Sequence, residues 1–197
     1  MTGRRDARER LVTAAEGLLT RSGPRSVSMD AAAAAAGAGK MSAYRHFASK
    51  EDLLAAALEQ HHPRHLRWLV GPGGEPGPVG ADPVSRILSA FDRLEAAAGN
   101  RAFRGCPFVD AALAGSETDE RPVRIAERHK KELSRALAGL ATQAGLPDPQ
   151  ELGAAVALVI DGAAVQAALA PDPATRQQIV RRGRRVAQIL LASAVPS

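Results

Sequence analysis

The segment from Ser28 to Phe47 reads SMDAAAAAAGAGKMSAYRHF. The hydroxyl of Ser28 can accept a hydrogen bond from a first-turn N–H, and alanines are the strongest helix formers. Gly37 can end this first helix, because glycine enters the left-handed conformation without a steric penalty. A second helix of about two turns can then begin at Gly39. The segment therefore predicts two short helices joined by a glycine turn, which is the helix-turn-helix arrangement.

Apolar residues on both sides of this segment provide surfaces for packing. Upstream, leucines and alanines at 11–19 repeat at helical spacing, and Ser22-Gly23-Pro24 stops that helix. Downstream, Ser49 can cap a third helix, whose leucines at 53, 54 and 58 would supply the opposite wall of a core that includes Phe47. This phasing argues against the alternative that the alanine run is low-complexity sequence.

Side chains on the second helix suit contact with double-stranded DNA. Charged and hydroxyl donors at 40, 44–46 and 50 can bind phosphate oxygens, and residues early on the helix are placed to read base edges. Tyr44 is expected to contact phosphate while it also packs, whereas His46 fits a phosphate contact or a solvated surface equally. The predicted DNA-binding residues are Ser28, Lys40, Met41, Ser42, Ala43, Tyr44, Arg45, His46 and Lys50.

Residues 8–60 resemble the N-terminal domain of the TetR family of bacterial transcriptional regulators. The pattern "Tyr, any, His-Phe, any, Ser-Lys-Glu, any, Leu-Leu" at 44–54 is highly specific to that family. The other matching pieces are Arg10-Leu11, Ala14-Ala15, Gly23, Val27-Ser28-Met29, Ala36-Gly37 and Lys40. The resemblance implies an all-α homodimer with a three-helix DNA reader and a larger helical ligand-binding domain, and most often a repressor.

The chain departs from this pattern at Ala32, at Ala38-Gly39 and at Ala43. The family usually has a large aliphatic residue, valine-serine and leucine at these places, so packing and capping around the second helix are reduced. The division that follows is 1–60 for the helix-turn-helix domain (motif about 28–47) and 61–197 for the ligand-binding and dimerisation domain, about nine helices in all. The sequence contains no run of period-two alternation, so no sheet is predicted.

Composition is consistent with this reading. The 197 residues carry a formal net charge of +5, which suits an anionic partner. Arginines at 4, 5, 8 and 10 predict either a basic arm along DNA or a frayed, solvated terminus. The single cysteine fits the reducing cytoplasm, and neither a signal peptide nor a membrane span is expected, so no membrane partner is predicted. The sequence predicts no cofactor and no metal site.

The last two predicted helices, about 150–169 and 174–194, each show an apolar stripe. Two long helices per subunit can form a four-helix bundle across a two-fold axis, and the resemblance implies the same. The alternative is that the stripes pack only within their own subunit. The predicted interface residues are Val156, Val159, Ala163, Ala167, Ile179, Val186, Ile189 and Leu190.

Helices at about 83–98 and 121–144 are expected to enclose an effector site, because such sites combine apolar walls with a few polar groups. Asp161 could instead cap a helix, pair with an arginine or lie at the dimer seam. The predicted ligand-binding residues are Trp68, Leu88, Phe91, Leu94, Phe103, Cys106, Phe108, His129, Asp161 and Gln166.

Two other functional classes draw on residues of this chain. A redox sensor would use Cys106, although a lone cysteine is usually a small buried apolar residue. A small helical enzyme would need Cys106, His129 and Asp161 together, and their spacing gives no catalytic signal, so no catalytic residue is predicted. His61, His62 and His65 are close enough for a metal site, but Pro63 interrupts them and they lack a carboxylate partner.

Overall fold

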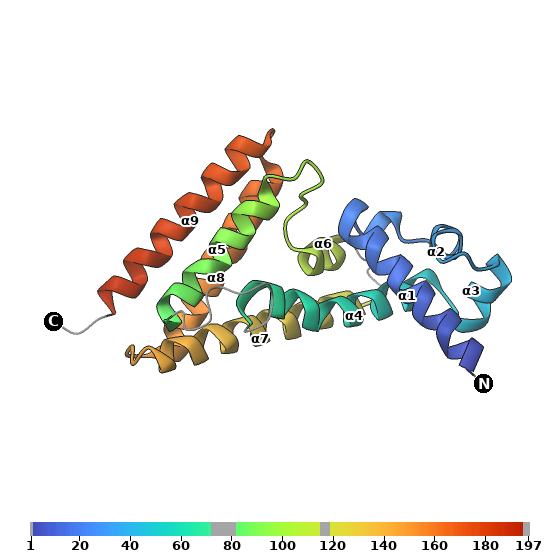
Figure 1. Ribbon diagram of the computed structural model, residues 1–197, viewed down its shortest axis with the longest axis horizontal. Coiled ribbons are helices and arrows are strands. Elements are labelled where there is room, and N and C mark those ends of the chain that lie inside the picture. Colours follow the sequence, from blue (N-terminus) through green and yellow to red (C-terminus); the bar gives the residue numbers. More distant parts are fainter. Residues whose placement is uncertain (1, 72–81, 115–118, 195–197) are drawn as a thin grey trace. The chain divides into compact units, whose positions relative to one another are not determined.

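The computed structural model describes residues 2–71, 82–114 and 119–194, with side chains from residue 7 onward. In these ranges the regular structure is entirely helical, as predicted. The chain divides into two compact units, Met1–Arg64 with Pro107–Glu127, and His65–Cys106 with Arg128–Ser197. The elements are α1 Thr2–Ser22, the 3-10 helix η1 Pro24–Ser26, α2 Met29–Ala35, α3 Lys40–His46, α4 Lys50–Val70, α5 Pro83–Ala98, α6 Pro107–Ala114, α7 Arg121–Gln143, α8 Pro149–Leu169 and α9 Pro173–Ser193 (Figure 1).

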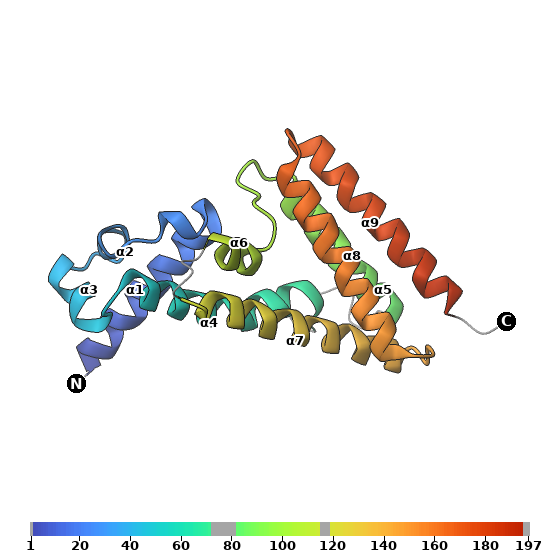
Figure 2. The same ribbon diagram turned by 180° about the vertical axis from the view of Figure 1, so that it is seen from behind.

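The first unit gathers α1, α2 and α3 around the N-terminal part of α4 (Figures 1 and 2). Its core consists of the apolar residues that the sequence places at helical spacing, including Phe47. The buried side chains include Leu11, Leu19, Val27, Ala32, Phe47, Leu53, Leu58 and Phe108. The unit therefore contains all of 1–60 and adds α6 and the first turns of α7, which the sequence-based division did not include.

The second unit packs α9 along α5 and α8, and the C-terminal part of α7 lies against α8. Phe91 from α5, Leu133 and Leu137 from α7, and Val156 from α8 are almost completely buried in its core. Two ion pairs link α9 to α5: Arg181 Nε lies 2.7 Å from Glu95 Oε1, and Arg184 Nε lies 2.8 Å from Asp92 Oδ1.

Helix α8 is apolar on nearly every side. Its length and composition alone would allow it to cross a membrane, although a single such helix is weak evidence. In the structure, 44% of its most apolar 18-residue stretch is buried. Its buried side packs on α7 and α9, as the core helix of a folded domain does.

Two local features differ from the sequence reading. Pro63, which the sequence suggests as an interruption among the histidines at 61–65, lies inside α4, and this helix continues to Val70. The stretch that begins at Pro107, for which no helix was predicted, forms α6, since proline is well tolerated in the first turn of a helix. The glycine- and proline-rich loop predicted at 71–78 lies, except for Gly71, outside the described residues.

Candidate nucleic-acid interface

Capping interactions define the first helix of the motif. The Ala31 N–H donates to Ser28 Oγ at 3.1 Å, which confirms the predicted N-cap. Gly37 has φ +61°, and the Ala38 N–H donates to the Ala33 carbonyl at 2.9 Å while the Gly37 N–H donates to the Ala34 carbonyl. These two bonds form a Schellman motif, so the turn between α2 and α3 depends on the glycine.

Helix α3 presents two different faces. Ala43 is 0% exposed and belongs to the core, whereas Met41 is 72% and Tyr44 49% exposed. Gly39 is the N-cap residue, and it provides no side-chain hydrogen bond. The outward face of α3 therefore begins at a helix end with no side-chain cap, where the Ser42 N–H donates to the Gly39 carbonyl at 2.8 Å.

The start of α4 adds a second set of donors. The Asp52 N–H donates to Ser49 Oγ at 3.1 Å, and Lys50, the first residue of α4, is exposed. Beneath these residues Phe47 is buried, and the guanidinium of Arg8 lies 5.2 Å from the centre of its ring. Lys50 thus places its positive charge at the N-terminal end of the α4 dipole, and its contact with phosphate stays a prediction.

An ion pair connects α2 with α3 on the exposed side. Lys40 Nζ donates to Asp30 Oδ2 at 2.9 Å, and both side chains are well exposed. The hydrogen bond to Asp30, together with its charge, raises the pKa of Lys40. Asp30 lies in the first turn of α2, where the helix dipole favours a negative charge, and nothing local in the sequence indicates its contact with a predicted DNA-binding lysine.

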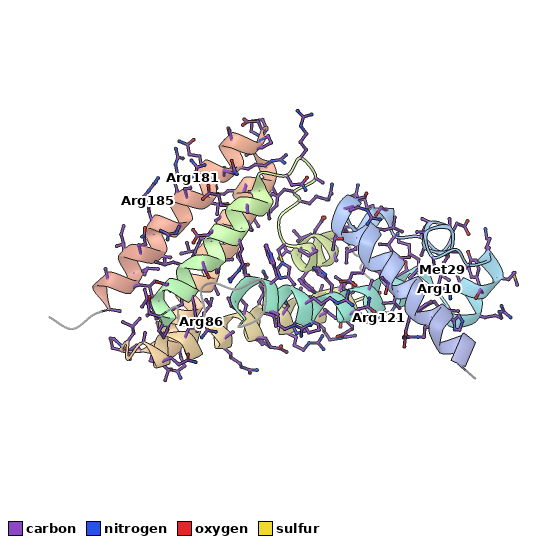
Figure 3. The ribbon with its side chains drawn as sticks, in the orientation of Figure 1. Arg10, Met29, Arg86, Arg121, Arg181 and Arg185 are labelled. Carbon is purple, nitrogen blue, oxygen red and sulfur yellow. The ribbon has the colours of Figure 1, made fainter. Side chains whose placement is uncertain are left out.

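Arg121, at the start of α7, forms ion pairs that join α7 to α4 within the first unit (Figure 3). Its Nη1 donates to Asp52 Oδ1 at 2.5 Å and its Nε to Asp119 Oδ1 at 2.8 Å. These bonds lower the pKa of both carboxyl groups, with the hydrogen bond from Arg121 as the largest cause. Arg121 therefore links the first turn of α4 to the start of α7.

Comparisons with known proteins agree with this geometry. Residues 11–57 match the sequence profile described as "Bacterial regulatory proteins, tetR family". A crystal structure described as a TetR transcriptional regulator from Streptomyces avermitilis is 31% identical, with 95% of this chain and 97% of that chain covered and a TM-score of 0.76. The chain belongs to the TetR family of bacterial regulators.

Other TetR-family structures extend the agreement. A TetR-family transcriptional regulator from Streptomyces coelicolor is 25% identical over 96% of this chain and 90% of its own, with a TM-score of 0.75. A TetR-family regulator from Cytophaga hutchinsonii has the same fold at 15% identity, covering 100% of this chain and 98% of its own, with a TM-score of 0.76. No curated protein sequence matches the chain.

With the TetR fold established, the predicted DNA-binding residues can be placed. Lys40, Met41, Tyr44, Arg45 and Lys50 are exposed, and Ser28, Ser42 and His46 are partly exposed. Ala43 is a correction: it was predicted as a DNA-binding residue, but it belongs to the core and has no exposed surface for DNA. Ser28 uses its oxygen as the α2 cap, and its hydroxyl hydrogen is left to donate.

Removal of the Asp30 carboxylate is expected to strengthen DNA binding. Asp30→Asn keeps the size of the side chain, releases Lys40 from its ion pair and removes a negative charge close to the phosphates. Affinity for any duplex should rise by roughly 3- to 10-fold at low salt, and the gain should shrink as salt is added. Fluorescence anisotropy with a labelled duplex measures this effect. The same substitution in a Lys40→Ala background should give a smaller gain, and an equal gain there would show that Lys40 plays no part.

Gly39→Ser is expected to stabilise the first unit. A Cβ at Gly39 would meet nothing within 4 Å, and its φ of −68° and ψ of 146° suit a serine N-cap. The hydroxyl can accept an unpaired N–H of α3, and the unfolded chain loses glycine's freedom, so about 0.5–1 kcal/mol should be gained. Urea unfolding followed by helical circular dichroism measures it, and Gly39→Ala separates the cap from the entropy effect. A serine variant no more stable than the alanine variant would contradict the cap.

The residues that were predicted to bind an effector are divided between the two units. Phe91 and Leu94 are buried in the second unit, and the partly buried Trp68, Leu88 and Phe103 pack against the same core. His129 is fully buried there and its ring lies 5.0 Å from that of His65. Phe108 lies in the first unit, where His61 stacks on its ring, and Gln166 is exposed, about 140° around α8 from Asp161, so neither shares the core of Phe91 and Leu94.

Lys130 is the polar residue of the second unit that the sequence reading missed. Its Nζ donates to Asp161 Oδ1 at 2.5 Å and to Cys106 Sγ at 3.3 Å. Burial alone would lower the pKa of Lys130, but the neighbouring Cys106 and Asp161 outweigh it, so the pKa is raised and the lysine stays charged. Of the roles open to Asp161, pairing with a cation is the one observed, although the cation is a lysine and not an arginine.

Most residues of the predicted dimer stripes on α8 and α9 pack within the second unit's own core. Val156, Ala163 and Ala167 are buried within the second unit's own core, and Val159, Ile179 and Leu190 pack against it. Of the eight predicted residues only Val186 and Ile189 are exposed. The large exposed apolar residues of α8 are Leu158, Val165 and Leu169, which the sequence reading did not select.

Proposed function

We propose that this protein is a cytoplasmic repressor that binds a palindromic operator as a homodimer and is released from it by a small, largely apolar effector. The observation that supports the proposal is the group of exposed hydrogen-bond donors on α3 and at the start of α4. They lie on the surface of the helix-turn-helix unit, whose core includes Phe47. Such groups bind phosphates and set the register of a recognition helix in the major groove. Met41 and Ser42 would then read base edges.

We place the dimer interface on the exposed apolar stripes of α8 and α9. Leu158, Val165 and Leu169 follow one another at seven and four residues, and Val186 and Ile189 are three apart, so each set lies along one helix face. Leu158 is 73% and Leu169 82% exposed in the single chain. Contiguous exposed apolar surface of this kind marks interaction sites, and a two-fold pair of such helices would bury it.

Leu158→Arg is expected to break the dimer. An unpaired charge placed at the centre of an apolar interface should weaken association by at least about tenfold, and operator affinity should fall with it. Sedimentation equilibrium measures the first effect and anisotropy the second. Leu113→Arg, on an equally exposed leucine of α6 in the first unit, is the control and should leave the mass of the assembly unchanged. A Leu158→Arg protein that remains dimeric would refute this interface.

The effector site is proposed in the second unit, beside Lys130, Cys106 and Asp161. Together with the buried His129, these residues supply a few polar groups beside an apolar core, which is the usual composition of a ligand site. An effector that prefers the non-binding arrangement of the dimer shifts the population away from operator-bound protein. Lys130→Met should therefore change the response to effectors while operator affinity in their absence is kept.

The test of the function is binding of the purified chain to the DNA upstream of its own coding sequence, at low salt. A retarded complex that competitor DNA of random sequence does not remove would support the proposal. Absence of any complex at low salt would contradict it, because the electrostatic part of binding alone should then be detectable.

One observation favours a second candidate, a regulator that senses oxidants through Cys106. The ammonium of Lys130 donates to the sulfur at 3.3 Å, and an electropositive neighbour of this kind is typical of cysteines that oxidants attack. The thiolate would attack hydrogen peroxide, giving a sulfenate and water, so that the sulfur is oxidised by the two electrons that reduce the peroxide. Mass spectrometry after peroxide treatment, with operator binding of Cys106→Ser alongside, distinguishes this candidate from a ligand-released repressor.

A further inference from the structure

The first unit contains a buried carboxylate that the DNA-binding surface does not use. Glu16, on α1, is only 7% exposed. It accepts hydrogen bonds from three residues that lie close together on α4. Gln60 Nε2 donates to Oε2 at 2.8 Å, Arg64 Nη1 donates to Oε2 at 2.7 Å, and His61 Nδ1 donates to Oε1 at 3.0 Å. Gln60 Nε2 also lies 3.1 Å from Thr13 Oγ1, one turn earlier on α1.

This cluster keeps Glu16 charged despite its burial. Burial by itself raises the pKa of the carboxyl, but the bonds from Gln60 and His61 and the charge of Arg64 lower it by more, so the pKa lies below its ordinary value. A buried carboxylate is costly unless its partners hold a definite geometry, and loss of one partner leaves an uncompensated charge. The bonds therefore define one separation and one rotation between α1 and α4.

The donors occupy the last turn of α4 that belongs to the first unit. His61 also stacks on Phe108 of α6, with ring centres 5.6 Å apart, and Pro63 follows within the same turn. The unit boundary lies directly after Arg64, and α4 continues from there into the second unit as far as Val70. The Glu16 carboxylate thus binds α4 directly before this helix passes out of the DNA-binding unit.

We infer that Glu16 is a positioning residue for operator binding, because it fixes the direction in which α4 leaves the reader and so sets the distance between the two readers of a dimer. The inference rests on the proposed function, in that it requires a dimer that binds two half-sites. It assigns no direct contact with DNA to Glu16, Gln60, His61 or Arg64.

Half-site spacing is the property that this role should control. One base pair added between half-sites turns them relative to each other by about 35°, as well as moving them apart, so a rigidly held pair of readers tolerates little change. If the α1–α4 connection is loosened, the readers can follow altered spacing. Discrimination between spacings should then decrease even where affinity for the preferred operator is kept.

The experiment uses the full-length dimer and three duplexes. The first is the inverted repeat that wild-type protein selects from random DNA, and the others have one base pair inserted or removed at its centre. Glu16→Gln should reduce the ratio of affinities between the preferred and altered spacings by roughly 3- to 10-fold. Arg64→Met, which keeps the side-chain stem and changes a half-exposed residue, should act in the same direction. Glu9→Gln, an exposed change of the same charge on α1, should leave the ratio unaltered.

The outcomes separate the inference from the function on which it rests. A general gain of affinity from the lost negative charge cancels in the ratio, and thermal melting shows whether each variant is folded. If Glu16→Gln is too unstable, Arg64→Met decides the matter. An unchanged ratio in the folded variants would overturn the role of Glu16 alone. A wild-type protein that binds all three duplexes equally, or none, would overturn the proposed function and this inference with it.

Discussion

Replacement of Tyr44 by phenylalanine together with Lys50 by alanine is expected to weaken binding of every duplex by about 100-fold, with little dependence on sequence. Both side chains are exposed on the reader, Tyr44 on α3 and Lys50 at the capped start of α4. Each would donate to a phosphate oxygen, and a hydrogen bond to a charged acceptor is worth more than one between neutral groups. Neither group is expected to read a base.

The diagnostic measurement for this double variant is the dependence of affinity on salt. Loss of the lysine contact should reduce the slope of log affinity against log salt by about one, because one fewer counterion is released. Lys131→Ala, which removes an exposed lysine from α7 in the second unit, is the control and should leave the slope as it is. An unchanged slope in the double variant would show that Lys50 does not contact phosphate.

Gly153→Ala is expected to lower the free energy of unfolding of the second unit by about 2–4 kcal/mol. Gly153 is buried on α8, where α7 passes close to its backbone. A Cβ there would lie 2.5 Å from the Ala138 nitrogen and 2.7 Å from the Ser134 carbonyl oxygen. Both are backbone atoms of a helix, so they cannot move aside as a flexible side chain would, and α7 and α8 must separate.

Gly139→Ala is the matched control for this prediction. Gly139 lies within α7, and a Cβ there would meet nothing within 4 Å. Since alanine is the better helix former, this variant should be more stable by about 0.5–1 kcal/mol. Urea unfolding of both variants gives the comparison. A Gly153→Ala protein as stable as its Gly139→Ala counterpart would show that the two helices are not held as close together as described.

The reader could be predicted from sequence because its signals are local. The cap at Ser28, the glycine turn at Gly37 and the apolar spacing of α1 each depend on residues within a few positions of one another, and the structure has all of them. Ala43 was misplaced for an equally local reason. Alanine is compatible with a core or a surface, and only the leucine usual at this place in the TetR family indicated that position 43 belongs to the core.

The second unit was harder to predict from the sequence, because its main contacts join residues that are far apart along the chain. Helix α8 is apolar on nearly every side, and its periodicity therefore could not distinguish the face buried on α7 and α9 from the exposed stripe of Leu158, Val165 and Leu169. The bonds of Lys130 to Cys106 and Asp161 span 24 and 31 residues. No short-range pattern marks such a pairing, and the same is true of the contacts between Glu16 and α4.

Selection of bound sequences from a pool of random duplexes, followed by footprinting of the enriched DNA, tests the central claim most directly. A dimeric regulator of this kind should enrich an inverted repeat and protect two half-sites whose centres are about 10–10.5 base pairs, or a multiple of that, apart. Recovery of no enriched sequence at low salt, or of a single half-site protected by one chain, would contradict the account.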